Sequence, residues 1–491
     1  MRMSRKFSGM SAAFLLLSAS AATAQQAQQA GASQPADMEA VRAELTRLRE
    51  ELEALKAAKP EAATGTASAS GESKKAEPKT LEERIDLVEV KQEDAVVAGD
   101  FPGSFRIPGT DISLRLYGIA ELNWFHDFQG DSSDIDFASF SPYLPLEDTP
   151  AGNRKNRNFF NARTSRFGIA AGMPTRLGQV SVKIEGDFAN EPRTGDTSQY
   201  GTPRNVFTQL QTNSYGFRLR HAYGQFGGLL IGQTWSTFMD VDNYPETVDF
   251  NGPVGATISR QPMIRYAYAT QGAGTFTVAL ENSASYVLND EGAVLGTSIA
   301  RLPDLILRWD KSFGWGATSV RGMTQELRVD DGADAEGIRR GWGAAASLLV
   351  KTRGNDLLTL GVTGGEGIGR YLNFIEGAIY DADADEIELE RAAGLIVGYQ
   401  FKPTSWVRIN LVYGMTRHFD NDFTDAIVEN GLNSGRFGVN RWVQQANFGP
   451  IFTPVQGVDL GIEGIVGSRK TLAGERGHMT RLNFMARYYI N

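Results

Sequence analysis

The dominant pattern in this chain is an alternation of apolar and polar residues that begins near Phe101 and continues to the C-terminus. One apolar row consists of Ile112, Leu114, Leu116, Ala120, Leu122 and Trp124, and the polar row between them contains Arg115, Tyr117, Glu121 and Asn123. Side chains two positions apart lie on the same face of a β-strand. The pattern therefore predicts many strands that have one apolar face and one charged face.

Strands of this kind occur in soluble β-sandwiches and in transmembrane β-barrels. Three features favour the barrel: the apolar faces end in aromatic residues, short turns alternate with long polar insertions, and the chain begins with an export signal. One tilted strand with its share of turn and loop takes about 22–26 residues, so the segment 101–491 accommodates about sixteen strands. We therefore predict an all-β fold, a transmembrane antiparallel β-barrel that encloses an aqueous channel.

Residues 1–24 have the features of a secretory signal peptide. Arg2, Arg5 and Lys6 form a basic region, and a short apolar run leads to an Ala-Thr-Ala cleavage site at residues 22–24. The alternative is a membrane anchor, which needs a longer apolar run. We therefore predict export, with the barrel in the outer membrane of the cell.

Residues 25–58 are predicted to form an α-helical coiled-coil stalk in the periplasm. The apolar residues of the seam, spaced alternately three and four apart, are Met38, Val41, Leu45, Leu48, Leu52 and Leu55. Acidic g positions face basic e positions, which favours a parallel assembly over a single helix on the protein's own surface. Three heptads are marginal alone, so other contacts must also hold the chains together. Residues 59–100 are predicted to be a flexible linker with a short helix.

Composition narrows the classes of function. The chain has no Cys and four His, so it offers no thiolate metal site, and we expect neither a metal nor a cofactor. The formal net charge of −9 argues against nucleic acid as a partner. No motif places a nucleophile beside a histidine, so we predict no catalytic residue and no enzyme. A structural tether is a further alternative, but the size of the barrel argues for a function of its own.

Arginine is strongly preferred over lysine in the predicted barrel, at thirty Arg against six Lys. Arg binds carboxylates and phosphates at two points. The basic residues predicted to line the pore are Arg166, Lys183, Arg218, Arg220, Arg265, Arg308 and Arg321. Any one of them can be neutralised by a nearby acid, but as a group they predict a wall that attracts anions. Arg218 and Arg220 flank Leu219, so they should share the lumen face, with an anion or an acid such as Asp240 or Glu246 between them.

Residues 236–259 leave the alternating pattern directly after the strand-like run 229–235. The acids in this segment are Asp240, Asp242, Glu246 and Asp249. A long acidic loop that faces a basic wall would set a transverse field across a pore. The alternative is an ordinary external loop. We predict that the segment folds inward and forms the constriction of the channel.

The order of these segments, together with several motifs, resembles the DcaP-like family of trimeric outer-membrane porins. The motifs are Arg106-Ile107-Pro108-Gly109-Thr110-Asp111 leading into Leu114-Arg115-Leu116-Tyr117-Gly118, then Ser165-Arg166-Phe167-Gly168-Ile169 and Gly232-Gln233-Thr234-Trp235-Ser236. The resemblance covers most of the mature chain. It implies a sixteen-stranded homotrimer, a periplasmic coiled coil and passive uptake of dicarboxylates or similar small anions. It also suggests Arg166, Arg218, Arg220 and Arg265 as anion-binding residues.

Several alternatives remain open from the sequence. A phosphate-selective porin would use a similar set of arginines, a general diffusion porin would be less selective, and a sugar-specific porin would need aromatic residues in its lumen. Expected partners are outer-membrane lipid and lipopolysaccharide, and contact between the stalk and peptidoglycan is left open. The chain ends in Tyr488-Tyr489-Ile490-Asn491, whereas such barrels usually end in an aromatic residue.

Overall fold

The computed structural model describes most of the predicted barrel segment. The described residues are 46–47, 50, 97–130, 144–176, 178–190, 215–296, 299–330, 332, 336–373, 375–435 and 437–490. The predicted signal peptide and nearly all of the predicted linker lie outside these residues. Of the predicted stalk, only Thr46, Arg47 and Glu50 are described, and these three are helical.

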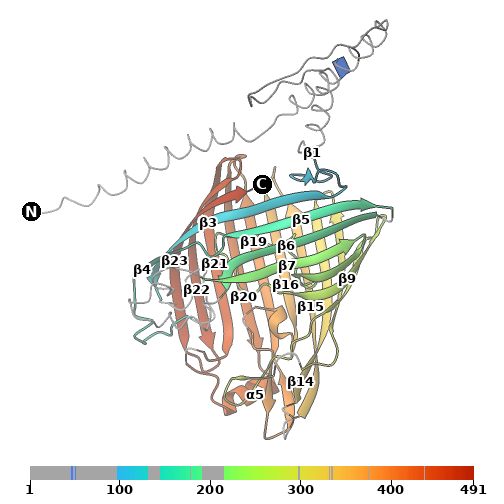
Figure 1. The fold of residues 1–491 in the computed structure, drawn as a ribbon. Coiled ribbons are helices and arrows are strands. Elements are labelled where there is room, and N and C mark those ends of the chain that lie inside the picture. Colours follow the sequence, from blue (N-terminus) through green and yellow to red (C-terminus); the bar gives the residue numbers. More distant parts are fainter. Residues whose placement is uncertain are drawn as a thin grey trace, which may run out of the picture. The chain divides into compact units, whose positions relative to one another are not determined.

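The chain divides into two compact units, and the barrel belongs to the unit formed by residues 99–105 and 111–491. Sixteen of the described strands pair antiparallel with their neighbours, and the last pairs with the first, so the sheet closes (Figure 1). They are β3 (Ser113–Gln129), β5 (Arg166–Thr175), β6 (Gly178–Asn190), β7 (Gly216–Phe226), β8 (Leu229–Trp235), β9 (Arg260–Thr270), β10 (Gly274–Glu281), β13 (Asp304–Phe313), β14 (Gly316–Asp330), β15 (Glu336–Lys351), β16 (Leu357–Glu366), β19 (Arg391–Phe401), β20 (Val407–Phe419), β21 (Asn440–Val455), β22 (Val458–Thr471) and β23 (Arg476–Ile490). The predicted all-β barrel of about sixteen strands is thereby confirmed.

The loops carry further elements that the alternating pattern did not predict. They are β4 (Arg157–Asn161), β11 (Val287–Leu288), β12 (Val294–Gly296), η3 (Gly369–Tyr371), β17 (Ala378–Asp381), β18 (Glu386–Leu389) and α5 (Asp422–Glu429), and two short strands, β1 (Val97–Ala98) and β2 (Phe105–Arg106), precede the barrel. β12, β11, β17 and β18 form a separate small sheet. Phe423 and Ile427 of α5 pack with Leu288 and Ile379 of that sheet in a buried apolar cluster. Among the described residues, no helix has the length and the apolar character needed to cross a bilayer.

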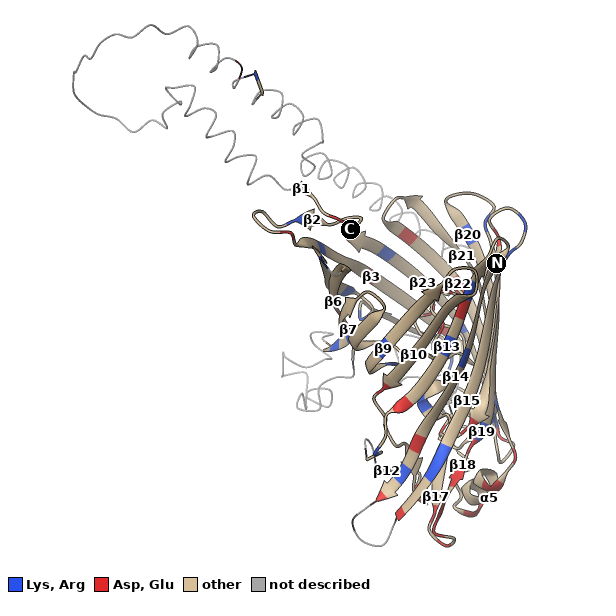
Figure 2. Cartoon of the chain, turned by 90° about the vertical axis from the view of Figure 1, so that its right-hand side faces the viewer, with Lys and Arg blue, Asp and Glu red and all other residues tan. Residues whose placement is uncertain are grey.

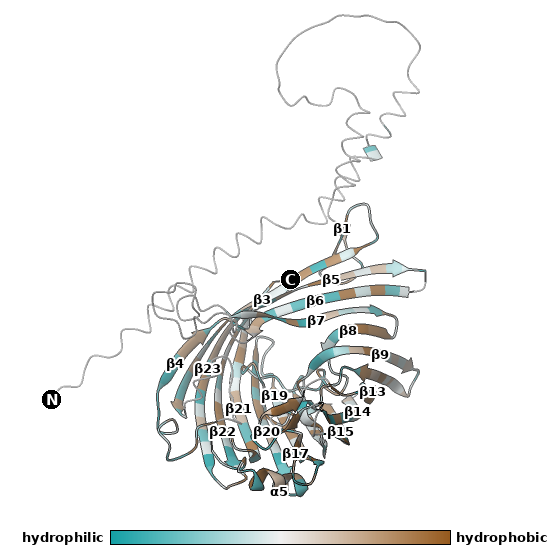
Figure 3. Cartoon of the chain, turned by 60° about the horizontal axis from the view of Figure 1, so that its bottom comes forward, coloured by the Kyte–Doolittle hydropathy of each residue, from teal (hydrophilic) through white to brown (hydrophobic). Residues whose placement is uncertain are grey.

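The two faces of the barrel wall follow the predicted alternation (Figure 3). On β3, Glu121 and Asn123 are buried on the inner face, whereas Leu116 and Leu122 are exposed on the outer face. Polar residues therefore fill the inside of this barrel and apolar residues cover its outside, the reverse of a soluble protein. This is the arrangement that a barrel surrounded by lipid requires.

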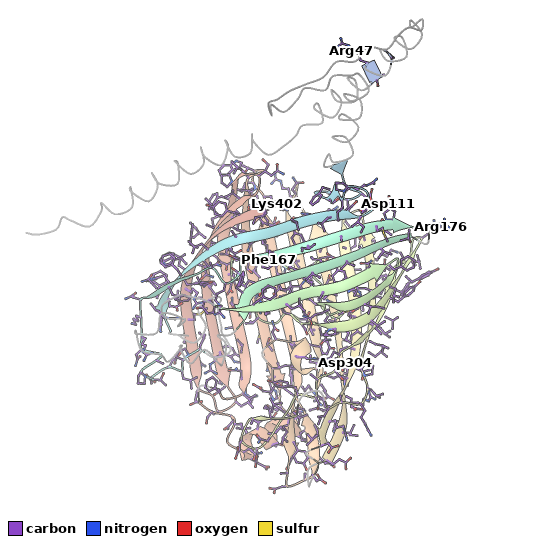
Figure 4. The ribbon with its side chains drawn as sticks, viewed as in Figure 1. Arg47, Asp111, Phe167, Arg176, Asp304 and Lys402 are labelled. Atoms are coloured by element: carbon purple, nitrogen blue, oxygen red, sulfur yellow. The ribbon has the colours of Figure 1, made fainter. Side chains whose placement is uncertain are left out.

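The connections between strands differ at the two ends of the barrel. At one end are short turns, such as residues 227–228 and 402–406, and at the other are long segments, such as residues 282–303 and 367–390. Arg176 and Lys402, which stand in two of the short turns, lie toward the same end of the barrel, and Asp304 lies nearer the other (Figure 4). In outer-membrane barrels the short turns face the periplasm and the long loops face outward.

Candidate functional site

The loop between β8 and β9, residues 236–259, folds into the barrel. Phe238 is fully buried within it and packs against the apolar cluster of the wall. The loop begins at a firm anchor: the carboxylate of Glu281 on β10 accepts hydrogen bonds from the Ser236 hydroxyl at 2.7 Å and from the Thr237 backbone N–H at 2.6 Å. The first residues of the loop are therefore fixed to the strand beside them.

Arg308 on β13 and Arg321 on β14 lie opposite each other and hold the next part of the loop. Arg308 donates to the backbone oxygen of Met239 at 2.6 Å and to the Asp240 carboxylate at 3.2 Å. Arg321 donates to the backbone oxygen of Phe238 at 3.2 Å. Both arginines were predicted to line the pore, but the structure places them behind the loop, where their charges are used to fix its backbone.

Asp240, a predicted constriction acid, is buried beneath the loop beside Arg308. It also accepts hydrogen bonds from the side chains of Asn243, at 2.6 Å, and Ser347. Burial alone would raise the pKa of Asp240, but the Arg308 guanidinium and these hydrogen bonds outweigh burial, so the pKa lies below its usual value. Asp240 is thus a charged anchor of the loop, whereas Asp242 is exposed.

Two further contacts hold the middle of the loop. Glu246 pairs with Arg408 on β20, with N–O distances of 2.7 and 2.9 Å. The buried carboxylate of Glu463 on β22 accepts the backbone N–H groups of Val248 and Asp249, at 3.0 and 2.9 Å. Strands far along the chain therefore fix the position of the loop across the lumen.

A cavity of about 650 Å³ lies between this loop and the strands β3, β5, β6, β7, β9 and β23. The acidic side chains that line it are Glu185, Glu246 and Asp249. The basic side chains that line it are Arg115, Arg166, Lys183, Arg218, Arg220, Arg260 and Arg487. Positive charge therefore outweighs negative charge around the cavity. Four of the seven predicted pore-lining basic residues, Arg166, Lys183, Arg218 and Arg220, are among them.

Arg218 and Arg220 point to the same face of β7, but they are bridged by an acid on the neighbouring strand. The fully buried Asp187 on β6 accepts a hydrogen bond from Arg218 at 2.8 Å and from Arg220 at 2.7 Å. Arg220 also donates to Glu185 at 2.7 Å. Asp240 and Glu246, the acids that the sequence offered as alternatives to a bound anion at this bridge, have other partners, and Asp187 occupies the place between the two arginines. Asp187 was missed, although it continues the polar row of its strand.

Lys183 and Tyr117 complete this charged network. The ammonium of Lys183 lies 3.4 Å from Glu185, and the Tyr117 hydroxyl donates to the same carboxylate at 2.9 Å. Tyr117 reaches across β5 at Gly168, where an added Cβ would lie 2.4 Å from the tyrosine oxygen. The absence of a side chain at this glycine therefore allows β3 and β6 to be linked across the strand between them.

Arg166 and Arg260 line the cavity and form no salt bridge among the described residues, although Glu185 lies near both. Arg260 lies over the ring of Trp235, with 4.1 Å from the guanidinium carbon to the ring centroid, and its Nε is buried without a hydrogen-bond partner. Sequence reasoning missed Arg260. Arg265, a predicted lining residue, follows on the lumen face of β9 but is not among the residues that line this cavity. Two guanidiniums in a narrow, partly desolvated space provide attachment points for a carboxylate or phosphate.

A closed sixteen-stranded barrel whose loop folds inward beside a charged wall defines an outer-membrane channel of the porin class. A family model described as DcaP outer membrane protein matches residues 104–490, so this chain belongs to the DcaP outer membrane protein family.

One solved structure supports this assignment, and others are more distantly similar. The outer-membrane channel DcaP of Acinetobacter baumannii is 25% identical with a TM-score of 0.65, and the match covers 80% of this chain and all of that one. OmpT of Vibrio cholerae in its trimer form is 13% identical, with a TM-score of 0.46 and coverage of 78% and 100%. An anion-selective porin from Comamonas acidovorans is also 13% identical, with a TM-score of 0.44 and coverage of 77% and 100%. A comparison with curated protein sequences finds no match.

Proposed function

We propose that this porin is a passive channel for small anionic solutes such as dicarboxylates. The observation that carries the proposal is the presence of Arg166 and Arg260, which form no salt bridge among the described residues, on the wall of the cavity beside the inward-folded loop. Arg218 and Arg220 contribute less than the sequence suggested, because Asp187 and Glu185 neutralise them. The acids of residues 236–259 shape the constriction mainly by fixing the loop.

Reversal potentials in a planar bilayer under a potassium chloride gradient test this proposal. The channel should prefer chloride to potassium, because unpaired guanidiniums raise the local concentration of anions. Replacing Arg166 and Arg260 together with Gln should reduce that preference severalfold and weaken the block of chloride current by succinate. Arg353→Gln, an exposed change in a short turn, is the matched control and should leave both unchanged. Preference for potassium in the unmodified channel would refute the proposal.

The same assay separates the alternative solutes. A phosphate-selective channel would be blocked by inorganic phosphate at concentrations at which succinate has little effect. A general diffusion channel would show only weak block by either anion.

We further propose that the channel is a homotrimer whose subunits meet along the shorter strands. β8 has seven residues and β10 has eight, whereas β15 and β21 have sixteen each. A strand of seven residues is about 23 Å long, and its extent along the membrane normal is smaller still because the strand is tilted. This part of the wall is therefore too short to span a hydrocarbon layer of about 30 Å on its own. The clustered aromatic side chains of Phe167, Phe188 and Phe217 on the outer face of β5–β7 supply apolar contact area.

Native mass spectrometry of the detergent-solubilised protein tests the trimer. The expected mass is three times that of one chain. Removing residues 25–96 should leave the trimer intact but easier to dissociate by heat, because the proposed periplasmic stalk adds contacts at one end. A purely monomeric truncated protein would show instead that the stalk sets the oligomer.

A further inference from the structure

Four arginines lie at the loop end of the barrel, along one part of its outer rim, and none of them lines the cavity beside the inward-folded loop. These rim arginines are Arg301, Arg340, Arg391 and Arg417. Arg340 stands on β15 between Ile338 and Trp342, which are exposed on the outer face. Figure 2 shows basic positions in blue on β14 and β15, toward the end of the barrel that carries the long loops.

The strand register places three of the rim arginines in one band with aromatic residues. Trp342 lies opposite Glu366, Glu366 lies opposite Arg391, and Arg391 lies opposite Phe419. Arg340 is two residues from Trp342 on the same strand face, and Arg417 is two residues from Phe419. Since Trp342 and Phe419 are 53% and 40% exposed on the outer face, the arginines stand beside an aromatic girdle. Such girdles mark the level of the lipid headgroups.

The acids nearby leave positive charge unbalanced in this band. Glu326 lies 3.8 Å from both Arg301 and Arg340, and one of its oxygens already accepts the Arg301 backbone N–H at 2.7 Å. Glu366 pairs with Arg391. Arg417 lies over the ring of Phe419, 5.5 Å from its centroid, and forms no salt bridge among the described residues; the nearby Asp420 pairs with Arg441. The salt bridges of the four rim arginines therefore involve only two carboxylates, Glu326 and Glu366, and the side chains of Arg301, Arg340 and Arg391 remain 61%, 49% and 52% exposed.

We propose that the rim arginines bind the phosphate groups of a phosphorylated glycolipid in the outer leaflet, that is, lipopolysaccharide. The long loops lie on the external side of an outer-membrane barrel, so this band meets the headgroups of the outer leaflet. Guanidinium groups bind phosphate through paired, charge-assisted hydrogen bonds, and the aromatic girdle beside them contacts the upper acyl chains. The proposal depends on the location of the barrel in the outer membrane and is independent of which solute the channel passes.

The test compares lipid retention by the full-length protein and by two triple variants at Arg340, Arg391 and Arg417. In one variant all three become Gln, and in the other all three become Lys. Purified lipopolysaccharide is added in detergent, and the bound lipid is counted by native mass spectrometry after detergent exchange. The Gln variant should retain at least tenfold less lipid than the unmodified protein, and the Lys variant should fall between them, because Lys keeps the charge but not the planar fork. Arg353→Gln combined with Lys402→Gln, in the short turns of the opposite rim, is the matched control and should retain lipid normally.

Two further arms make the outcome decisive. Lipopolysaccharide whose phosphates have been removed should be retained poorly by the unmodified protein, which separates phosphate recognition from acyl-chain packing. Chloride preference should be the same in the Gln variant and the unmodified protein, so failure of the lipid site is distinguishable from failure of the proposed channel function. Equal retention by the Gln variant and the unmodified protein, or equal retention of the dephosphorylated lipid, would overturn the proposal. If the Gln variant does not fold, as judged by its gel mobility before and after heating, the Lys variant and the dephosphorylated lipid decide the question.

Discussion

The carboxylate of Glu246, in the inward-folded loop, and the guanidinium of Arg408, on β20, form a two-point ion pair with N–O distances of 2.7 and 2.9 Å. Arg408 also donates to Asp459 on β22 at 2.7 Å, and Gln400 donates to Glu246 at 2.9 Å. Glu246 itself lines the cavity. One ion pair therefore links the position of the loop, and hence the width of the lumen beside it, to the opposite wall.

Glu246→Gln should loosen the middle of the loop, because the two-point charge pair is replaced by weaker neutral hydrogen bonds. In single-channel recordings we expect more frequent brief closures and greater noise in the open current. Asp242→Asn removes the same charge from an exposed position of the same loop and should shift ion preference without adding noise. Equal noise in the two variants would show that the Glu246–Arg408 pair does not hold the loop.

Asp187→Asn should increase the preference for anions, because Arg218 and Arg220 lose the acid that bridges them. It should also lower thermal stability, since a hydrogen bond to a charged group contributes about 1.5–3 kcal/mol. Asp310→Asn is the matched control: Asp310 pairs with Arg308 behind the loop, so ion preference should change little. Reversal potentials measure the first effect and thermal unfolding the second. An unchanged chloride preference in Asp187→Asn would mean that the paired arginines do not face the ion path.

The faces of the barrel could be predicted from the sequence because the alternation is local. The row of Leu116 and Leu122 on one side of β3, with Glu121 and Asn123 on the other, follows from strand geometry alone. The inward fold of residues 236–259 was also predicted, from the loss of alternation and the acids that follow. The contacts of this acidic segment could not be predicted, because its partners lie on strands far along the chain and include Arg408 on β20 and Glu463 on β22.

The partners of the lumen arginines depend on strand register, which the sequence pattern does not specify. Asp187 meets Arg218 and Arg220 because β6 pairs with β7, and a register shift there leaves Arg220 without a residue directly opposite. Arg260 falls out of phase with the lumen residues that follow it on β9, so alternation assigns it to the outer face. It lines the cavity because it stands at the end of the loop, opposite Trp235.

Gly168→Ala should destabilise the barrel, because the added methyl group would lie 2.4 Å from the Tyr117 hydroxyl that crosses this strand. Tyr117 would have to leave Glu185, and overpacking of this kind typically costs about 1–3 kcal/mol. The midpoint of thermal unfolding, followed by heat-modified gel mobility, should fall by several degrees. Gly224→Ala on β7 is the matched control, since the nearest atom to its added Cβ is 4.0 Å away. Equal midpoints for the two variants would contradict the proposed role of Gly168.

The long loops should lose local stability as pH rises, because of Glu376. Burial, and then the nearby Glu390, raise the pKa of Glu376 to about 7. The Glu390 carboxylate is committed to the backbone N–H groups of Glu376 and Gly377, at 2.6 and 2.7 Å, and to His418 at 3.3 Å. A carboxyl whose folded pKa is raised stabilises the fold below its unfolded pKa, and this contribution is lost as pH rises through the folded value.

The stability that Glu376 contributes should therefore be lost between pH 4.5 and pH 7, with a slope of at most about 1.4 kcal/mol per pH unit. Hydrogen exchange in residues 367–390, compared at pH 4 and pH 8, measures it. Glu376→Gln removes the ionising group, so the variant should be protected more than the unmodified protein at pH 8 and about equally at pH 4, below the unfolded pKa. Glu386→Gln, an exposed acid in the same segment, should follow the unmodified protein at both values. If Glu376→Gln gives no added protection at pH 8, ionisation of the Glu376 carboxyl does not destabilise the folded loop.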